Sequence, residues 1–317
     1  MLCGKYFLLC VTSCLFFFKF KTVCGYSRYY HYVVGCPKTL IDIKDFERDL
    51  KESFFGQHIA SKTVVSALAG NLHRSKYNKK PLVMCFHGSS GTGKNYLSDL
   101  IASHMFYWEK VKNLRYHVIH GRSDFPMTSQ IEHYKKKLHS DVISAIKSCD
   151  TNVFVFDEVH YIPMGILDIL APILENNDVS IDSRNSIFIF LTNAGSDYII
   201  QKSLDNLTNG FSRKNMKVED FDTILLKSAF NEEGGLKRSS LIDSHIIDFY
   251  VPFLPLEKNH VQQCMEAELK HLEKHLDSET KSQILRMITF GPKPEKIFST
   301  VGCKRIKAWI STKTYNN

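Results

Sequence analysis

The sequence predicts an α/β fold, in which helices flank a parallel sheet built around a glycine-rich loop and a small helical domain follows. A strand-sized apolar run leads directly into a glycine-rich loop that ends in lysine. Two further apolar runs end in polar side chains, and a proline-marked boundary precedes segments with helical periodicity. We therefore expect parallel strands whose carboxyl ends form one functional edge.

The composition is typical of a globular protein of 317 residues. Hydrophobic residues make up 44% and charged residues 23%, which excludes collagen-like, low-complexity and wholly disordered chains. The 41 Lys+Arg and 33 Asp+Glu residues give a formal net charge of +8. Because these lysines are scattered among acidic residues, we expect no nucleic-acid partner.

The N-terminal segment, residues 1–25, predicts entry into the secretory pathway. A single lysine precedes an apolar run of thirteen residues, Tyr6 to Phe18, and small residues follow at Val23-Cys24-Gly25. This order is typical of a signal peptide, whereas a membrane span needs about 20 apolar residues. Phe20 extends the run, so an uncleaved short hydrophobic anchor is the alternative. A tyrosine-rich linker is expected over 26–40.

A secretory route makes the cysteines and one sequon informative. Asn206-Leu207-Thr208 is a glycosylation sequon, which makes Asn206 a candidate glycan site. Of nine cysteines, four lie in or beside the N-terminal apolar run, and Cys85 lies in a predicted strand where a buried thiol is expected. In an oxidising compartment the remaining four are candidates for disulfides: Cys36, Cys149, Cys264 and Cys303.

The most specific motif follows the predicted strand 82–86 and precedes a helix expected over 96–105. It reads Gly88-Ser89-Ser90-Gly91-Thr92-Gly93-Lys94-Asn95, and we call it the phosphate loop. In this GxxxxGK pattern the glycines let backbone N–H groups turn toward phosphates, and Lys94 reaches the β/γ oxygens, so all eight residues are predicted to bind ATP. Asn95 replaces the usual hydroxyl residue, and its amide oxygen is a predicted ligand of Mg²⁺ or of a Mg²⁺-bound water.

Polar residues also end the two downstream strands. The strand at 153–156 leads into Asp157 and Glu158. Asp157 is expected to hold Mg²⁺ and Glu158 to act as the general base toward the attacking water. The strand at 187–191 leads toward Asn193, which is expected to position that water. The adjacent Asp-Glu pair favours ATP hydrolysis over transfer to a second substrate.

The chain divides into a large α/β domain over 41–250 and a small helical domain over 251–317, with Pro252 and Pro255 at the boundary. A helix with Ser129 as its cap is expected up to Cys149. Phe125 is the aromatic available to a pore loop near 124–129, although Phe125-Pro126 also fits a turn. Further helices are expected over 164–174, 219–230, 257–276 and 278–288, and around Gly302-Cys303-Lys304.

These motifs resemble the AAA+ superfamily in its Clp/Hsp100-like branch, and more narrowly the torsin family, from about Cys36 to the C-terminus. Two features are particular to torsins: Asn95 after the loop lysine, and Gly302-Cys303-Lys304. This sequence departs from the torsin pattern at Val159-His160-Tyr161, where torsins commonly carry an acidic and basic pair. The departure is expected to change an activator-binding or pore face. The other segments that resemble torsins are Phe55-Gly56-Gln57-His58, Phe156-Asp157-Glu158, 188–195 and 251–256.

The resemblance implies an AAA+ ATPase of the endoplasmic reticulum lumen and nuclear envelope, or perinuclear space, that remodels protein or membrane assemblies. ATP and Mg²⁺ are the implied cofactors. Lys304 matches the second sensor, which touches the γ-phosphate. The implied disulfides are Cys264–Cys303, which links nucleotide response to redox state, and a structural Cys36–Cys149. Homo- or hetero-oligomers and peripheral membrane association are also implied.

The resemblance further implies a dependence on another protein. Clp-like relatives carry an arginine finger before an Ile-Asp pair, and Ile246 stands at that position here. Weak hydrolysis alone and a membrane-anchored luminal activator that supplies an arginine are therefore implied. Arg213 and Arg238 are the alternatives within the chain.

Two other functions stay open. One is a scaffold that binds ATP and switches partners with little turnover. The other is a cytosolic or nuclear clamp-loader-like ATPase acting on DNA, which a glycan on Asn206 would exclude. The sequence does not identify the protein substrate.

Overall fold

The structure is a computed structural model that describes residues 36, 41–73, 77–178 and 180–314. The N-terminal segment predicted as a signal or anchor lies outside the described residues, as does the predicted linker over 26–40 apart from Cys36. Within the described ranges, no helix combines the length and the apolar character that a membrane crossing requires.

A five-stranded sheet forms the centre of the molecule, in the order β2-β3-β4-β1-β5. All neighbouring pairs are parallel, which confirms the predicted parallel α/β fold. The sequence predicted the three central strands but neither flanking strand. The strands are β1 (Leu82–His87), β2 (Tyr116–His120), β3 (Val153–Asp157), β4 (Ile187–Thr192) and β5 (Phe249–Pro252).

The central strands are apolar along almost their whole length because helices cover both faces of the sheet. Every residue of β1 and β4 is buried. On one face Phe154 stacks on Phe188 with ring centroids 4.8 Å apart, and Phe156 stacks on Phe190 at 4.9 Å. Such continuous apolar strands are typical of a parallel sheet between two helical layers.

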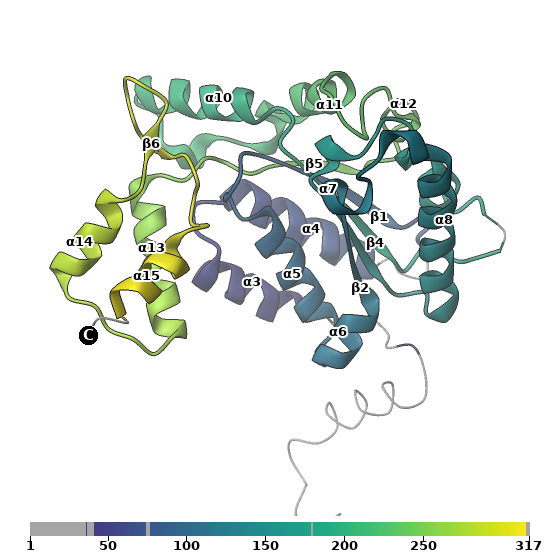
Figure 1. The fold of residues 1–317 in the computed structure, drawn as a ribbon, viewed down its shortest axis with the longest axis horizontal. Coiled ribbons are helices and arrows are strands. Elements are labelled where there is room, and N and C mark those ends of the chain that lie inside the picture. The colour runs from purple at the N-terminus through teal and green to yellow at the C-terminus, as the bar shows by residue number, and fades with distance from the viewer. Residues whose placement is uncertain (1–35, 37–40, 74–76, 179, 315–317) are drawn as a thin grey trace, which may run out of the picture.

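Two helical layers enclose the sheet (Figure 1). One contains α3 (Ile43–Ser53), α4 (His58–His73), α5 (Lys94–Met105) and α6 (Glu109–Arg115). The other contains α8 (Ile131–Ser148), α9 (Ala171–Leu174), α10 (Ser196–Thr208), α11 (Asp222–Asn231) and α12 (Ser240–Asp243). Short connections are α7 (Gly121–Asp124) and the 3₁₀ turns η1 (Thr128–Gln130), η2 (Val159–Tyr161), η3 (Leu167–Leu170), η4 (Arg213–Asn215) and η5 (Val218–Asp220).

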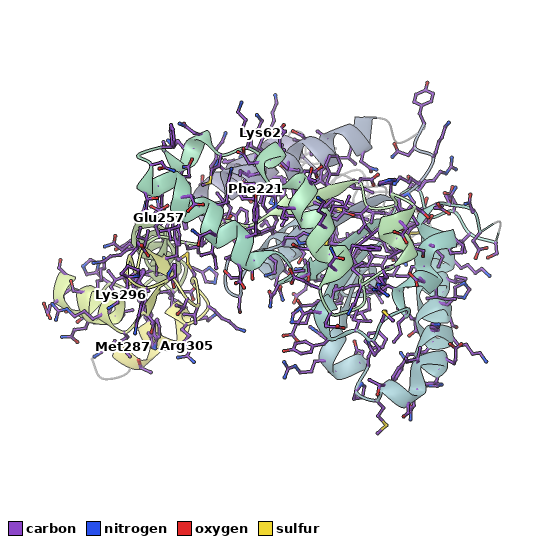
Figure 2. All side chains as sticks on the ribbon, turned by 90° about the horizontal axis from the view of Figure 1, so that it is seen from above. Lys62, Phe221, Glu257, Met287, Lys296 and Arg305 are labelled. Atoms are coloured by element: carbon purple, nitrogen blue, oxygen red, sulfur yellow. A yellow bond between two sulfur atoms is a disulfide. The ribbon has the colours of Figure 1, made fainter. Side chains whose placement is uncertain are left out.

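The C-terminal helices have their own apolar core, which includes Leu256, Val261, Ile284 and Ile310. Figure 2 shows this smaller part, which carries Met287, Lys296 and Arg305, set to one side of the larger body. It contains α13 (Lys258–His271), α14 (Ser278–Arg286), a hairpin of β6 (Phe290–Gly291) and β7 (Phe298–Ser299), and α15 (Ile306–Thr314). Because β5 ends at Pro252, the sheet extends two residues past the expected boundary at 250.

Several helices differ from their predicted bounds. Ser129 is not a helix cap: it lies in η1, and α8 begins at Ile131. The helix expected from 164 is replaced by η3 and α9, because Gly165 takes a φ of 82°. The helix expected up to 276 ends at His271.

Candidate nucleotide-binding site

The phosphate loop connects β1 to α5 at the carboxyl edge of the sheet. Glycine is required at Gly93, where φ is 105° and an added Cβ would lie 2.7 Å from the Phe54 ring. The side chain of Gln57 holds the loop in place: its Nε2 donates to the carbonyls of Thr92 at 2.9 Å and Leu254 at 2.8 Å. Gln57 belongs to the torsin-like segment 55–58, but no local pattern around it predicts this supporting role.

Lys94 joins the phosphate loop to the end of β4. Its Nζ donates to the carbonyls of Gly88 and Ser89 and, at 3.0 Å, to Oδ1 of Asn193. Burial lowers the pKa of Lys94 to about 8, and the Asp157 carboxylate partly opposes that shift. The ammonium group is thus held by neutral oxygens that a phosphate can replace.

The predicted metal ligands meet across the loop. Nδ2 of Asn95 donates to Oδ2 of Asp157 over 2.7 Å, so the amide oxygen of Asn95 is the side-chain atom left to face a cation. Oδ1 of Asp157 accepts from the backbone N–H of Glu158 at 2.8 Å. A carboxylate and an amide oxygen are hard oxygen ligands of the kind Mg²⁺ prefers, so this pair fits the predicted metal.

Glu158 lies beside the segment that departs from the torsin pattern. Its backbone takes a left-handed φ of 52°, and its Oε2 lies 3.9 Å from Nε of Arg122. The Arg122 guanidinium in turn lies over the ring of Tyr161, 4.1 Å from its centroid. His160 lines the same cavity as Glu158. The departure at 159–161 therefore adjoins the predicted general base.

The segment Gly302-Cys303-Lys304 forms a turn before α15 rather than the expected helix, because Gly302 takes a φ of 53°. This turn contacts the phosphate loop directly: the N–H of Cys303 donates to the carbonyl of Gly91 at 3.3 Å. A Cβ added to Gly302 would lie 2.0 Å from the same carbonyl oxygen. Cys303 forms a disulfide with Cys264 of α13, with Cα atoms 6.2 Å apart.

A cavity of about 710 Å³ lies between the two parts of the molecule. Residues 90–95 of the phosphate loop, the end of β3 and Asn193 line it from the sheet, and Lys304 faces it from the C-terminal part, whereas Gly88 and Ser89 do not line it. All predicted catalytic and metal residues thus surround one space: Asn95, Asp157, Glu158, Asn193 and Lys304. The loop amides, two lysines and an oxygen-ligand pair fit a nucleoside triphosphate with Mg²⁺.

Within the described residues, no arginine lines this cavity. Ile246 is buried in the core of the sheet domain. Arg213 is held within its own chain by the carbonyls of Gly56 and Pro255 and by the carboxylate of Glu257. Arg238 is exposed but does not line the cavity.

Two other predicted features lie away from the cavity. Phe125 is buried and packs edge-on against Tyr134, so it is not an exposed pore aromatic. Asn206 lies in the last turn of α10, and its Nδ2, the atom that a glycan would modify, donates to the carbonyls of Phe211 and Ser212.

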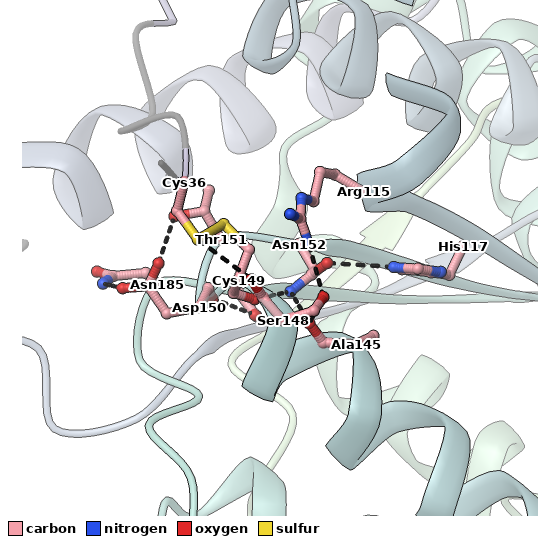
Figure 3. The surroundings of a disulfide bond; sticks show 11 residues. Cys36, Arg115, His117, Ala145, Ser148, Cys149, Asp150, Thr151, Asn152 and Asn185 are labelled. Carbon is pink, nitrogen blue, oxygen red and sulfur yellow. Dashed lines mark hydrogen bonds between the residues drawn. A yellow bond between two sulfur atoms is a disulfide. The ribbon is translucent and has the colours of Figure 1, made fainter. Parts of the chain in front are cut away.

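The second disulfide joins Cys36 to Cys149, with Cα atoms 5.4 Å apart (Figure 3). Cys149 follows α8 at the amino end of β3, whereas the nucleotide cavity lies at the carboxyl edge. Among the described cysteines Cys85 is free and buried, and burial raises its thiol pKa.

Comparisons with known proteins identify relatives along most of the chain. The family model described as Torsin matches residues 29–156, and the model described as Torsin-1A, C-terminal domain, matches residues 256–311. A Torsin-like protein of Drosophila melanogaster is 33% identical over 279 residues, which cover 86% of this chain and 82% of the relative. A Torsin-like protein of Caenorhabditis elegans is 32% identical, with 86% and 77% covered.

Solved structures of Hsp104 share the fold. The S. cerevisiae Hsp104–ADP complex matches with a TM-score of 0.61 at 18% identity, covering 86% of this chain and 47% of the Hsp104 chain. The extended Hsp104–casein complex matches with a TM-score of 0.60 at 17% identity, covering 92% and 50%. This chain therefore spans about half the length of the Hsp104 chains. At these identities the similarity concerns the fold, which is the predicted AAA+ fold.

Proposed function

This chain belongs to the torsin family of AAA+ ATPases, and from that premise we propose that it hydrolyses ATP to remodel protein or membrane assemblies in the endoplasmic reticulum lumen and nuclear envelope. One observation carries the proposal: the phosphate loop, Asp157, Glu158, Asn193 and Lys304 surround a single cavity. Each of these groups has a distinct task in triphosphate hydrolysis.

The residues of the chain divide the work as follows. The loop amides and Lys94 bind the phosphates, and Lys304 approaches from the C-terminal part. Asp157 and Asn95 would hold Mg²⁺, which neutralises phosphate charge when bound. Glu158 would accept the proton of the attacking water, and Asn193, already hydrogen-bonded to Lys94, would orient that water.

The arginine that stabilises charge in the transition state is proposed to come from another protein. The two arginines considered within the chain do not line the cavity, and Arg213 already has four hydrogen bonds to its own chain. An arginine finger contributes about 10³–10⁵ in rate in well-studied nucleotide switches. We therefore propose weak hydrolysis alone and stimulation by a membrane-anchored luminal activator within a homo- or hetero-oligomer.

The luminal location is supported by the order of residues 1–25 and by two disulfides, which form in oxidising compartments. Peripheral membrane association is proposed for the same N-terminal segment. A glycan found on Asn206 of the expressed protein would establish luminal exposure.

A switching scaffold is the second candidate, because no arginine among the residues that the structure describes lines the cavity. Single-turnover hydrolysis of ATP separates the two functions, with and without the luminal domain of a candidate activator. We expect little turnover alone and a large stimulation by the activator, which substitution of the activator's arginine abolishes. If luminal domains bind the ATP-loaded chain but leave its turnover unchanged, that result would favour the scaffold.

A further inference from the structure

A group of exposed apolar side chains lies just before α6 and along it. Tyr107, Trp108 and Leu114 are 68%, 42% and 63% exposed, and the Tyr107 and Trp108 rings meet edge-on with centroids 5.6 Å apart. Lys110 is exposed between them along the helix. We call these four residues the α6 surface. Val111 on the same short helix is buried in the sheet domain, so the helix has a distinct inner face as well.

The α6 surface lies beside the point where the N-terminal segment joins the domain. At the end of α6, Nη1 of Arg115 donates to Oγ of Ser148 at 2.8 Å. Sγ of Cys36, which is bonded to Cys149, lies 3.5 Å from the carbonyl oxygen of the same Ser148 (Figure 3). The disulfide therefore fixes the start of the described chain next to α6.

The sequence ahead of Cys36 contains the apolar run Tyr6 to Phe18. Residues 19–35 separate that run from the cysteine. An extended chain spans about 3.3–3.6 Å per residue, so this segment is long enough to let the run and the α6 surface reach the same bilayer. Membrane binding strengthens with the apolar area buried at the lipid interface, so a second apolar surface beside the run would strengthen attachment.

The chemistry of the α6 surface suits a lipid interface. Tyr and Trp are enriched where membranes meet water, because their rings are apolar at one end and polar at the other. Leu114 adds an apolar side chain, and Lys110 can keep its ammonium among the headgroups while its stem lies along them. Two residues on a seven-residue helix and two just before it form too small an area for a stable protein interface, which buries about 800 Å² per partner.

We propose that the α6 surface is the membrane-contacting face of this protein, where Tyr107, Trp108 and Leu114 enter the lipid interface beside the N-terminal apolar run. This inference rests on the proposed peripheral membrane association, in which residues 1–25 stay attached as the uncleaved hydrophobic anchor. α6 leads into the amino end of β2, whereas the nucleotide cavity lies at the carboxyl edge of the sheet. The proposed orientation therefore turns the cavity away from the membrane, where a luminal domain can reach it.

Tryptophan fluorescence provides a direct test, since the chain has only two tryptophans, Trp108 and Trp309. Trp309→Phe in the full chain, starting at Met1, leaves Trp108 as the sole reporter. With phosphatidylcholine vesicles that carry brominated acyl chains, we expect a blue shift and quenching of Trp108. The matched Trp108→Phe variant reports from Trp309, which is partly buried against the C-terminal core, and should show neither change.

Two results would overturn the inference. One is vesicle-bound chain in which Trp108 remains unquenched. The other is a Trp108 signal shielded from aqueous iodide before vesicles are added, which would mean that the chain's own N-terminal run or another copy covers the α6 surface.

Vesicle flotation gives a second readout. Tyr107→Ser, Trp108→Ser and Leu114→Ser together should weaken partitioning of the full chain about tenfold. The control variant, Tyr77→Ser with Phe211→Ser, removes exposed aromatic rings elsewhere and should leave partitioning unchanged. Equal partitioning of the two variants would contradict the proposal. ATP affinity measured on both variants shows that they fold, and loss of ATP binding in the parent chain would instead refute the proposed function.

Discussion

Lys94 carries the charge that the phosphate loop offers to a nucleotide, and its environment makes that charge dependent on pH. Burial lowers its pKa to about 8, so in the free protein the ammonium form dominates below that pH and is lost above it. Phosphate oxygens favour the charged form, so nucleotide binding raises the Lys94 pKa again.

The rise of the Lys94 pKa on nucleotide binding leads to a prediction for ATP affinity. The dissociation constant should be nearly constant below a pH of about 8 and should rise above it, by at most about tenfold per pH unit, with proton uptake on binding. Calorimetry in buffers of different ionisation enthalpy measures both quantities. In Lys94→Arg the cation persists, so the pH dependence should flatten; the same slope in that variant would assign the titration to another group.

Glu158 allows binding to be separated from hydrolysis. Glu158→Gln removes the base but keeps the size of the side chain, so we expect single-turnover hydrolysis with activator to fall by about 10²–10⁴-fold. ATP affinity should change little, because the phosphate loop and Lys94 remain. Near-normal hydrolysis by this variant would show that Glu158 is not the general base.

At the scale of elements, the contact between the phosphate loop and the 302–304 turn connects the C-terminal part to the nucleotide. Gly302→Ala would place a methyl group 2.0 Å from the carbonyl oxygen of Gly91. We expect this variant to separate the turn from the loop and to weaken ATP binding at least about tenfold, which corresponds to about 1.4 kcal/mol.

Gly210 provides a matched control for that substitution. Its φ of 76° is also left-handed, but a Cβ there would meet nothing within 4 Å. Gly210→Ala should therefore report the backbone strain alone, with unchanged ATP affinity. If both alanine variants weaken binding equally, the turn contact does not contribute to nucleotide binding.

Arg213 stabilises the connection between α4, the chain after β5 and α13. Its side chain is only 10% exposed, and it pairs with Glu257 at 3.1 Å while donating to two backbone carbonyls. Arg213→Ala leaves these acceptors without a donor, and we expect a loss of about 3–5 kcal/mol in the free energy of unfolding. Urea titration checks this value. Arg238→Ala, at an exposed arginine, is the control and should change stability by less than about 0.5 kcal/mol.

At the scale of the whole molecule, the sequence predicted those parts in which neighbouring residues carry the signal. The strand, loop and helix around Lys94 are contiguous, and the runs before Asp157 and Asn193 are apolar throughout because both sheet faces are covered. The sequence therefore predicted the three central strands, and the side chains that it assigned after them, Asp157, Glu158 and Asn193, line the same cavity as Lys94.

The parts that escaped prediction depend on distant contacts. β2 reads Tyr-His-Val-Ile-His, which is half-polar because it is an edge strand, and β5 resembled a proline-marked boundary. Gln57 supports a loop 35 residues away. The turn at Gly302 follows from its close approach to Gly91, which no local pattern reveals.

The central claim is that the convergence of the phosphate loop, Asp157 and Glu158 forms an ATP site, and calorimetric titration of Mg-ATP into purified Glu158→Gln protein tests it most directly. We predict saturable binding of a single nucleotide per chain, which Lys94→Ala abolishes without loss of fold. Absence of any saturable heat from the oxidised, folded protein, or identical binding by the Lys94→Ala variant, would contradict the account.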